Sequence, residues 1–198
     1  MKSINTTNAA AMEEVAHARD RGQTVYVETC PQYLTLDKSC YYQEDWLESA
    51  KYVCSPPLRT EFDQAVLWQG LRDGAVQTVS TDHCSFTLAQ KDAGRNDFTA
   101  IPGGLPGVET RGEVVYTAGV GKRRIDLGTM CRVLSENPAK LYGLFPRKGI
   151  IAPGSDAGAW AVPHVRGGAD EYAHLADALG DTYLPDLGRG IDALARRF

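Results

Sequence analysis

Helix-like and strand-like patterns alternate along the first 81 residues of the chain. Residues 9–21 and 60–74 show the 3.6-residue spacing of helices, and each pattern ends at a glycine. Residues 24–29 and 76–81 are short β-rich runs, and each follows one of these helices. Alternation of this kind is typical of βαβ units and a parallel sheet. The sequence therefore predicts an α/β fold.

The remaining patterns predict further short elements. A short strand is expected at 52–54 and a long connecting loop at 86–107. Apolar residues from 127 to 134 predict an amphipathic helix, and Asn137 followed by a proline predicts the N-cap of another. A last strand-like run lies at 148–151.

Composition narrows the class of protein. The 198 residues are 43% hydrophobic and 23% charged, as in soluble globular proteins, but a complete (β/α)8 barrel typically needs about 250 residues. A net charge of −4 predicts no nucleic-acid partner, and the lack of a long apolar run predicts no membrane or export signal, so a cytoplasmic protein is expected. Five irregularly spaced cysteines predict reduced thiols.

The segment Val79–Phe86 carries the most informative chemistry. Its β-branched run ends in adjacent Asp82 and His83. At the C-terminal end of a barrel strand, a carboxylate can bind a metal ion and also accept a proton from metal-bound water. The alternative is structural, because Asp and His also cap turns that follow strands. The motif alone leaves both interpretations open.

Five ordered segments together resemble a known family. They are ETCPQYL (28–34), CSPPLR (54–59), TDHC (81–84), IPGGLPGVETR (101–111) and NPAKLYGL (137–144), the last continuing to residue 157. Their order over residues 9–157 is similar to that in the C-terminal half of dihydropyrimidinases and D-hydantoinases, which belong to the cyclic amidohydrolase superfamily. Gln32 favours the hydantoinase branch over allantoinases, which more often show His there.

The resemblance implies a domain organisation. Residues 1–147 would form an incomplete TIM-like (β/α)8 barrel, its C-terminal part, and residues 148–157 would begin the small β-sandwich that flanks the barrel in this superfamily. Residues 158–198 do not match in sequence. We interpret them as a frameshifted, foreign or disordered tail, with a genuine lineage-specific C-terminus as the alternative.

The resemblance also implies a reaction. Family members open the C–N bond of dihydropyrimidines or hydantoins to N-carbamoyl amino acids, with two zinc ions that hold a hydroxide. Asp82 matches a metal ligand that also accepts and returns the proton. Ser55 and Gly103 match residues whose backbone binds the small cyclic amide, although each also has a structural reading: prolines hold Ser55 extended, and Gly103 permits a turn.

Asp82 alone matches the family's metal ligands, so we expect this chain by itself to lack the complete zinc site and to be inactive. The family resemblance implies a homo-oligomer, a tetramer. Two other classes stay open: a non-catalytic dihydropyrimidinase-like binding or assembly module, and an inert gene fragment.

Overall fold

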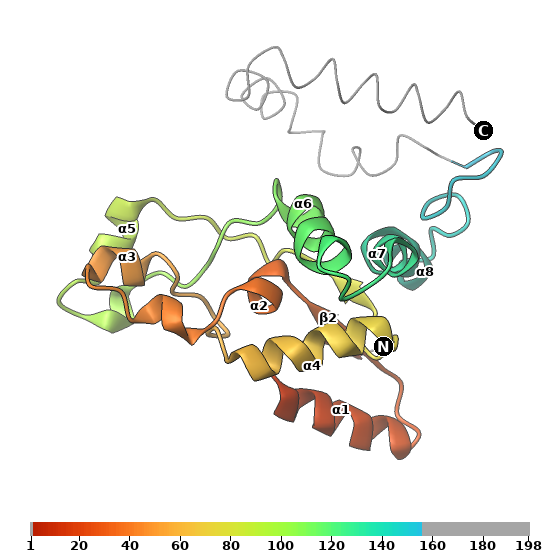
Figure 1. Cartoon of the computed structure of the whole chain (residues 1–198), viewed down its shortest axis with the longest axis horizontal. Coiled ribbons are helices and arrows are strands. Elements are labelled where there is room, and N and C mark those ends of the chain that lie inside the picture. The colour runs from red at the N-terminus through yellow and green to blue at the C-terminus, as the bar shows by residue number, and fades with distance from the viewer. Residues whose placement is uncertain (1, 156–198) are drawn as a thin grey trace, which may run out of the picture. The chain divides into compact units, whose positions relative to one another are not determined.

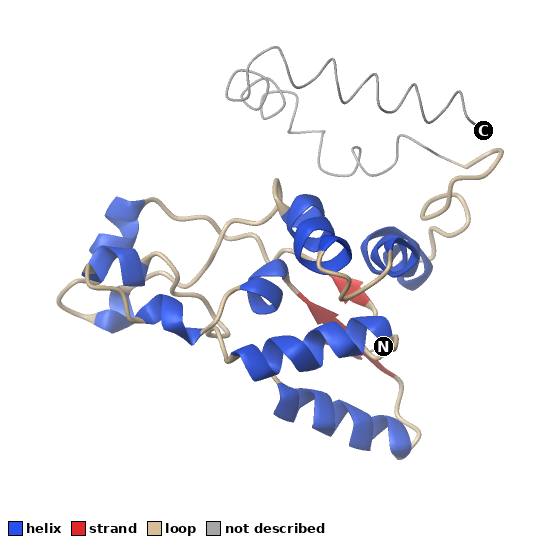
Figure 2. Cartoon of the chain, viewed as in Figure 1, coloured by secondary structure: helices blue, strands red, loops and turns tan. Residues whose placement is uncertain are grey.

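Three parallel strands, β1 (Lys2–Asn5), β2 (Val25–Thr29) and β3 (Thr78–Val79), form a sheet in the order β1-β2-β3. They belong to a computed structural model that describes residues 2–155, of which residues up to 150 form one unit (Figure 1). Figure 2 shows the helices around the sheet. The predicted parallel sheet and the strand at 24–29 are confirmed. β1 was not predicted, and β3 is shorter than the expected 76–81.

Helices α1 (Ala9–Asp20) and α4 (Glu61–Arg72) confirm the helices predicted at 9–21 and 60–74. A capping box begins α4: the Thr60 side chain accepts from the Asp63 N–H, and the Asp63 carboxylate accepts from the Thr60 N–H. The same carboxylate accepts a 2.9 Å hydrogen bond from the N–H of Ala9, at the first turn of α1. Asp63 therefore stabilises the N-termini of both helices.

Each of these two helices buries one side and exposes the other. In α1 Val15 is buried and Ala16 is exposed, and in α4 Phe62 is 70% exposed. Trp68 of α4 is buried, and its indole N–H donates to the Leu34 carbonyl at 3.0 Å.

Most of the remaining elements are short. They are α2 (Pro31–Thr35), η1 (Lys38–Tyr41), α3 (Trp46–Ala50), α5 (Leu88–Asp92), η2 (Phe98–Ala100), α6 (Arg111–Val115), η3 (Tyr116–Gly121), α7 (Leu127–Cys131), η4 (Arg132–Glu136) and α8 (Asn137–Leu141). Figure 1 shows α3 and α5 side by side, away from α1. The expected loop at 86–107 thus contains α5 and η2.

Two predictions about local structure were wrong. Residues 52–54 form no strand, because the Val53 carbonyl accepts from the Gly104 N–H and from the Lys91 ammonium rather than from a neighbouring strand. The helix predicted at 127–134 is confirmed, but Asn137 does not cap a new one. Elements α7, η4 and α8 are consecutive, and the Asn137 amide donates to the Gln77 carbonyl at 2.8 Å.

The strand expected at 148–151 is also absent, and residues 148–155 contain no strand. The Lys148 N–H closes a turn by donating to the Leu144 carbonyl at 2.9 Å. Gly149 has φ +87°, and a β-carbon there would lie 2.6 Å from that of Ala139, so this glycine packs tightly on α8. The assignment of residues 148–157 to the start of a β-sandwich stays a prediction. Residues 158–198 lie outside the part of the chain that the structure describes.

Side chains from the sheet and the helices that cover it form one core. Its fully buried aliphatic members are Val27, Leu34, Leu67, Leu71, Val76, Val79 and Val115. Burying such a side chain contributes about 1.5–3 kcal/mol. This packing fixes the carboxyl ends of the strands, where the candidate site lies.

Candidate functional site

Polar side chains meet where the three parallel strands end. Asn5 is the last residue of β1, Cys30 follows β2, and Ser80 follows β3. The Cys30 sulfur lies 3.3 Å from the Ser80 hydroxyl and accepts a 4.0 Å contact from the Asn5 amide. Burial raises the pKa of Cys30 to about 12, so this side chain is a neutral thiol at pH 7. The carboxyl edge of the sheet is therefore polar.

Asp82 lies two residues beyond this edge, in a strained backbone conformation. Its φ of +47° falls in the left-handed region, which glycine favours and which Asp enters more readily than most other residues. Strain of this kind is concentrated at functional sites. Burial is the main cause that raises the pKa of Cys30 and of Tyr33, and the charge of Asp82 raises both further. The negative charge of Asp82 therefore acts on side chains at this edge of the sheet.

The hydrogen bonds of Asp82 distinguish its two interpretations. Asp37, Asp45, Asp97 and Asp126 each cap a helix by accepting from a backbone N–H two or three residues later. The exposed Asp82 side chain has no such bond, nor any other hydrogen bond within residues 2–155. An ordinary capping role does not explain this residue, and its carboxylate is available to a ligand.

His83 joins the Asp82 turn to the glycine-rich segment. Its Nδ1 atom accepts hydrogen bonds from the N–H groups of Gly107 (3.1 Å) and Val108 (3.2 Å), so the proton of a neutral ring is on Nε2. The Cys84 N–H adds a 3.0 Å bond to the Leu105 carbonyl. His83 is therefore a structural clamp between the two segments.

Ser55 and Gly103 lie next to each other. A β-carbon on Gly103 would be 3.6 Å from both the β-carbon and the main-chain nitrogen of Ser55. Both residues are exposed, and within residues 2–155 their main-chain N–H and C=O groups have no hydrogen-bond partner. The free N–H groups of these two residues can donate hydrogen bonds to a planar ligand, and their free C=O groups can accept hydrogen bonds from it.

Lys91 is a residue of this region that the sequence analysis missed. Its side chain is 2% exposed, and its ammonium donates to the carbonyls of Val53, Pro102 and Gly104, which flank Ser55 and Gly103. A lysine in a polar loop normally indicates solvent exposure, so no local signal marked it.

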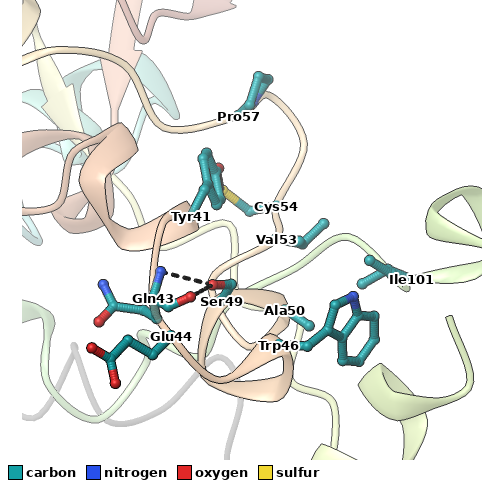
Figure 3. A pocket seen from close by; sticks show the side chains of 10 residues that line it. All are labelled: Tyr41, Gln43, Glu44, Trp46, Ser49, Ala50, Val53, Cys54, Pro57 and Ile101. Atoms are coloured by element: carbon teal, nitrogen blue, oxygen red, sulfur yellow. Dashed lines mark hydrogen bonds between the residues drawn. The ribbon is translucent and has the colours of Figure 1, made fainter. Parts of the chain in front are cut away.

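An open cavity of about 550 Å³ lies beside the same two segments (Figure 3). Its lining residues are Tyr41, Gln43, Glu44, Trp46, Ser49, Ala50, Val53, Cys54, Pro57 and Ile101. Gln43 and Ser49 hydrogen-bond to each other at its wall, where the Gln43 N–H donates to the serine hydroxyl at 3.0 Å. Asp82, Ser55 and Gly103 are not among the lining residues, so this cavity is separate from the site.

The described residues do not complete a metal site. Within residues 2–155 no group of three or more His, Cys, Asp and Glu side chains is arranged to hold an ion. A catalytic zinc ion needs about three protein ligands. Asp82 can supply one carboxylate, and further ligands would have to come from outside this range.

A parallel sheet with an aspartate after its third strand is consistent with a hydrolase of the barrel type. Residues 5–178 match the Amidohydrolase family, and the chain belongs to this metal-dependent family. The match extends past residue 157, where the sequence analysis placed the end of the resemblance.

The chain is similar to hydantoinases in particular. It is 48% identical over 155 residues to a D-hydantoinase of Geobacillus stearothermophilus, covering 78% of this chain and 33% of that enzyme. It is 41% identical over 175 residues to a D-phenylhydantoinase of Escherichia coli O1:K1, covering 88% and 37%. The chain thus spans about a third of the length of these relatives.

The chain is also similar to solved structures of dihydropyrimidinases and hydantoinases. A dihydropyrimidinase from Brevibacillus agri matches with a TM-score of 0.75 and 47% identity, and an L-hydantoinase from Arthrobacter aurescens with 0.70 and 31%. Each match covers 78% of this chain and 34% of the solved chain. The expected family is confirmed, and the small parallel sheet corresponds to part of these folds.

Proposed function

We propose that this chain serves in the hydrolytic opening of cyclic amides, dihydropyrimidines or hydantoins, to N-carbamoyl amino acids. Asp82 carries the proposal, because its strained backbone presents a carboxylate without any hydrogen bond inside residues 2–155 at the carboxyl edge of the sheet. The similarity to D-hydantoinases supports the substrate class.

Asp82 has the proton-transfer role in this proposal. Its carboxylate accepts a proton from the attacking water and returns it to the ring nitrogen that leaves, so that one group acts as general base and then as general acid. The left-handed turn and the His83 clamp hold it in place. No side chain within residues 2–155 competes for it with a hydrogen bond.

Ser55 and Gly103 bind the ring. Their free N–H groups donate to the ring carbonyl oxygens, and their free carbonyls accept from the ring N–H groups. Fixing a planar ring by main-chain groups lowers the entropic part of the barrier. Gly103 takes part through its main chain alone.

Zinc, in a two-ion centre to which Asp82 contributes one ligand, is our proposal for the metal, as implied by the family resemblance. Assembly into a homo-tetramer and a cytoplasmic location also stay predictions. Among the described residues, no helix is long and apolar enough to cross a membrane.

A chimera tests the proposal. The region of this chain that matches the Geobacillus D-hydantoinase would replace the corresponding third of that enzyme, and ring opening of dihydrouracil and hydantoin would be followed by absorbance. We expect metal-dependent hydrolysis by the chimera and none by the isolated chain. A soluble, metal-loaded chimera without hydrolysis would contradict the proposal and favour a non-catalytic assembly module.

A further inference from the structure

Lys91 is a buried cation without a carboxylate partner inside residues 2–155. Its side chain is 2% exposed, and its ammonium contacts three carbonyl oxygens and the ring of Phe86, whose centroid lies 5.4 Å away. Burial lowers the pKa of this lysine. A buried charge is costly unless its donors are satisfied, and here three N–H donors meet three acceptors.

The three carbonyl acceptors lie close in sequence to Ser55 and Gly103. The ammonium donates to Val53 at 2.7 Å, to Pro102 at 2.7 Å and to Gly104 at 3.0 Å. One carbonyl lies two residues before Ser55, and the other two lie on either side of Gly103. One ammonium therefore joins the two segments that carry the free main-chain groups.

The bond to Pro102 has an electronic consequence. The carbonyl of Pro102 and the N–H of Gly103 belong to the same peptide group, whose resonance couples the oxygen to the nitrogen. A cation at the oxygen withdraws electron density from the nitrogen, so the N–H becomes a stronger donor; hydrogen bonds in series polarise one another in this way.

We propose that Lys91 is a positioning residue that holds Ser55 beside Gly103 and, by polarising the Pro102–Gly103 peptide, strengthens the Gly103 N–H as a donor to a cyclic imide. This inference rests on the proposed function, since it assumes that the Gly103 N–H contacts the substrate. It adds a residue that does not touch the ring but acts through the peptide group that does.

The test uses the whole chain labelled with 15N, and hydantoin and dihydrouracil as probes. Titration of wild type is expected to move the amide signals of Gly103 and Ser55 in a saturable way. Lys91→Met removes the charge and all three hydrogen bonds. Lys91→Gln also removes the charge but keeps two N–H donors, and it replaces the methionine variant if that variant does not fold. Lys91→Arg keeps the charge.

We expect about 2- to 20-fold weaker binding for Lys91→Met and Lys91→Gln. Without the polarising cation, the strength of one desolvated hydrogen bond should fall by about 10–30%. Lys91→Arg should restore most of the affinity. Without ligand, the Gly103 15N signal should move upfield in the two neutral variants. The control is Lys140→Met, which removes an exposed lysine paired with Glu136 and should change neither readout.

Two failures can be separated. Unchanged affinity and an unchanged Gly103 15N signal in folded neutral variants would overturn the inference and leave the proposed function intact. If the probes do not move the Gly103 and Ser55 signals of wild type, the proposed substrate contact is contradicted, and the ligand-free 15N comparison still decides whether Lys91 polarises the peptide.

Discussion

A β-carbon on Gly103 would lie 3.6 Å from the main-chain nitrogen of Ser55, an ordinary van der Waals distance. The neighbouring glycine has no such room, because a β-carbon on Gly104 would lie 2.4 Å from the carbonyl oxygen of Cys84. The site thus has one glycine that tolerates a side chain and one that does not.

We therefore predict opposite results for two alanine substitutions. Gly103→Ala should change the free energy of unfolding by less than about 1 kcal/mol, whereas Gly104→Ala should lower it by about 2 kcal/mol or more, since the backbone must shift. Urea denaturation of both variants measures the difference. Equal stabilities would show that the segment packs differently from the structure described.

Asp63 is predicted to contribute a pH-dependent part of the stability. Burial raises its pKa, but hydrogen bonds from the Thr60 side chain and from the Ala9 and Thr60 N–H groups outweigh this and lower it overall. A carboxyl group with a lowered folded-state pKa stabilises the protein above its unfolded pKa of about 3.9, and this stability is lost as the pH falls through the folded-state value.

Asp63→Ala should therefore cost about 1–2 kcal/mol at pH 7 and much less at the acid end of the range. Thermal melts from pH 7 down to the acid limit of folding measure this. The control is Asp20→Asn at the exposed end of α1. A cost that does not depend on pH would show that the charge of Asp63 is unimportant.

The cysteines should differ in reactivity. Cys30 and Cys54 are buried and burial raises the pKa of both, to about 12 for Cys30, while Cys84 and Cys131 are exposed. Because the thiolate is the reactive form, iodoacetamide at pH 8 should label the exposed pair in the native chain and the buried pair only after unfolding. Mass spectrometry of tryptic peptides gives the order, and early labelling of Cys30 would contradict the described core.

Local chemistry explains what the sequence could predict. The Thr60–Asp63 capping box and the glycine stops at Gly22 and Gly74 depend on neighbouring residues, so they are readable without a structure, and both glycines have positive φ. The parallel arrangement followed from the alternation of helices and strands.

Long-range contacts explain what it could not predict. Asn137 has the local signature of an N-cap but instead binds the Gln77 carbonyl, 60 residues away. Lys91 satisfies carbonyls up to 38 residues away, and its burial depends on a fold that no local pattern shows. The same holds at the site, where Asp82, Ser55 and Gly103 were expected from resemblance but their hydrogen-bond state needed the structure.

The most direct test of the role of Asp82 is Asp82→Asn in the chimera with the Geobacillus D-hydantoinase. Asparagine keeps the size and one oxygen that can bind a metal, but it cannot carry the proton, so metal content should be largely retained while kcat falls by about 10²- to 10⁴-fold. Ser55→Ala is the control and should change kcat little, because its proposed contacts are made by backbone atoms. Near-normal hydrolysis by metal-loaded Asp82→Asn would contradict the proposed function.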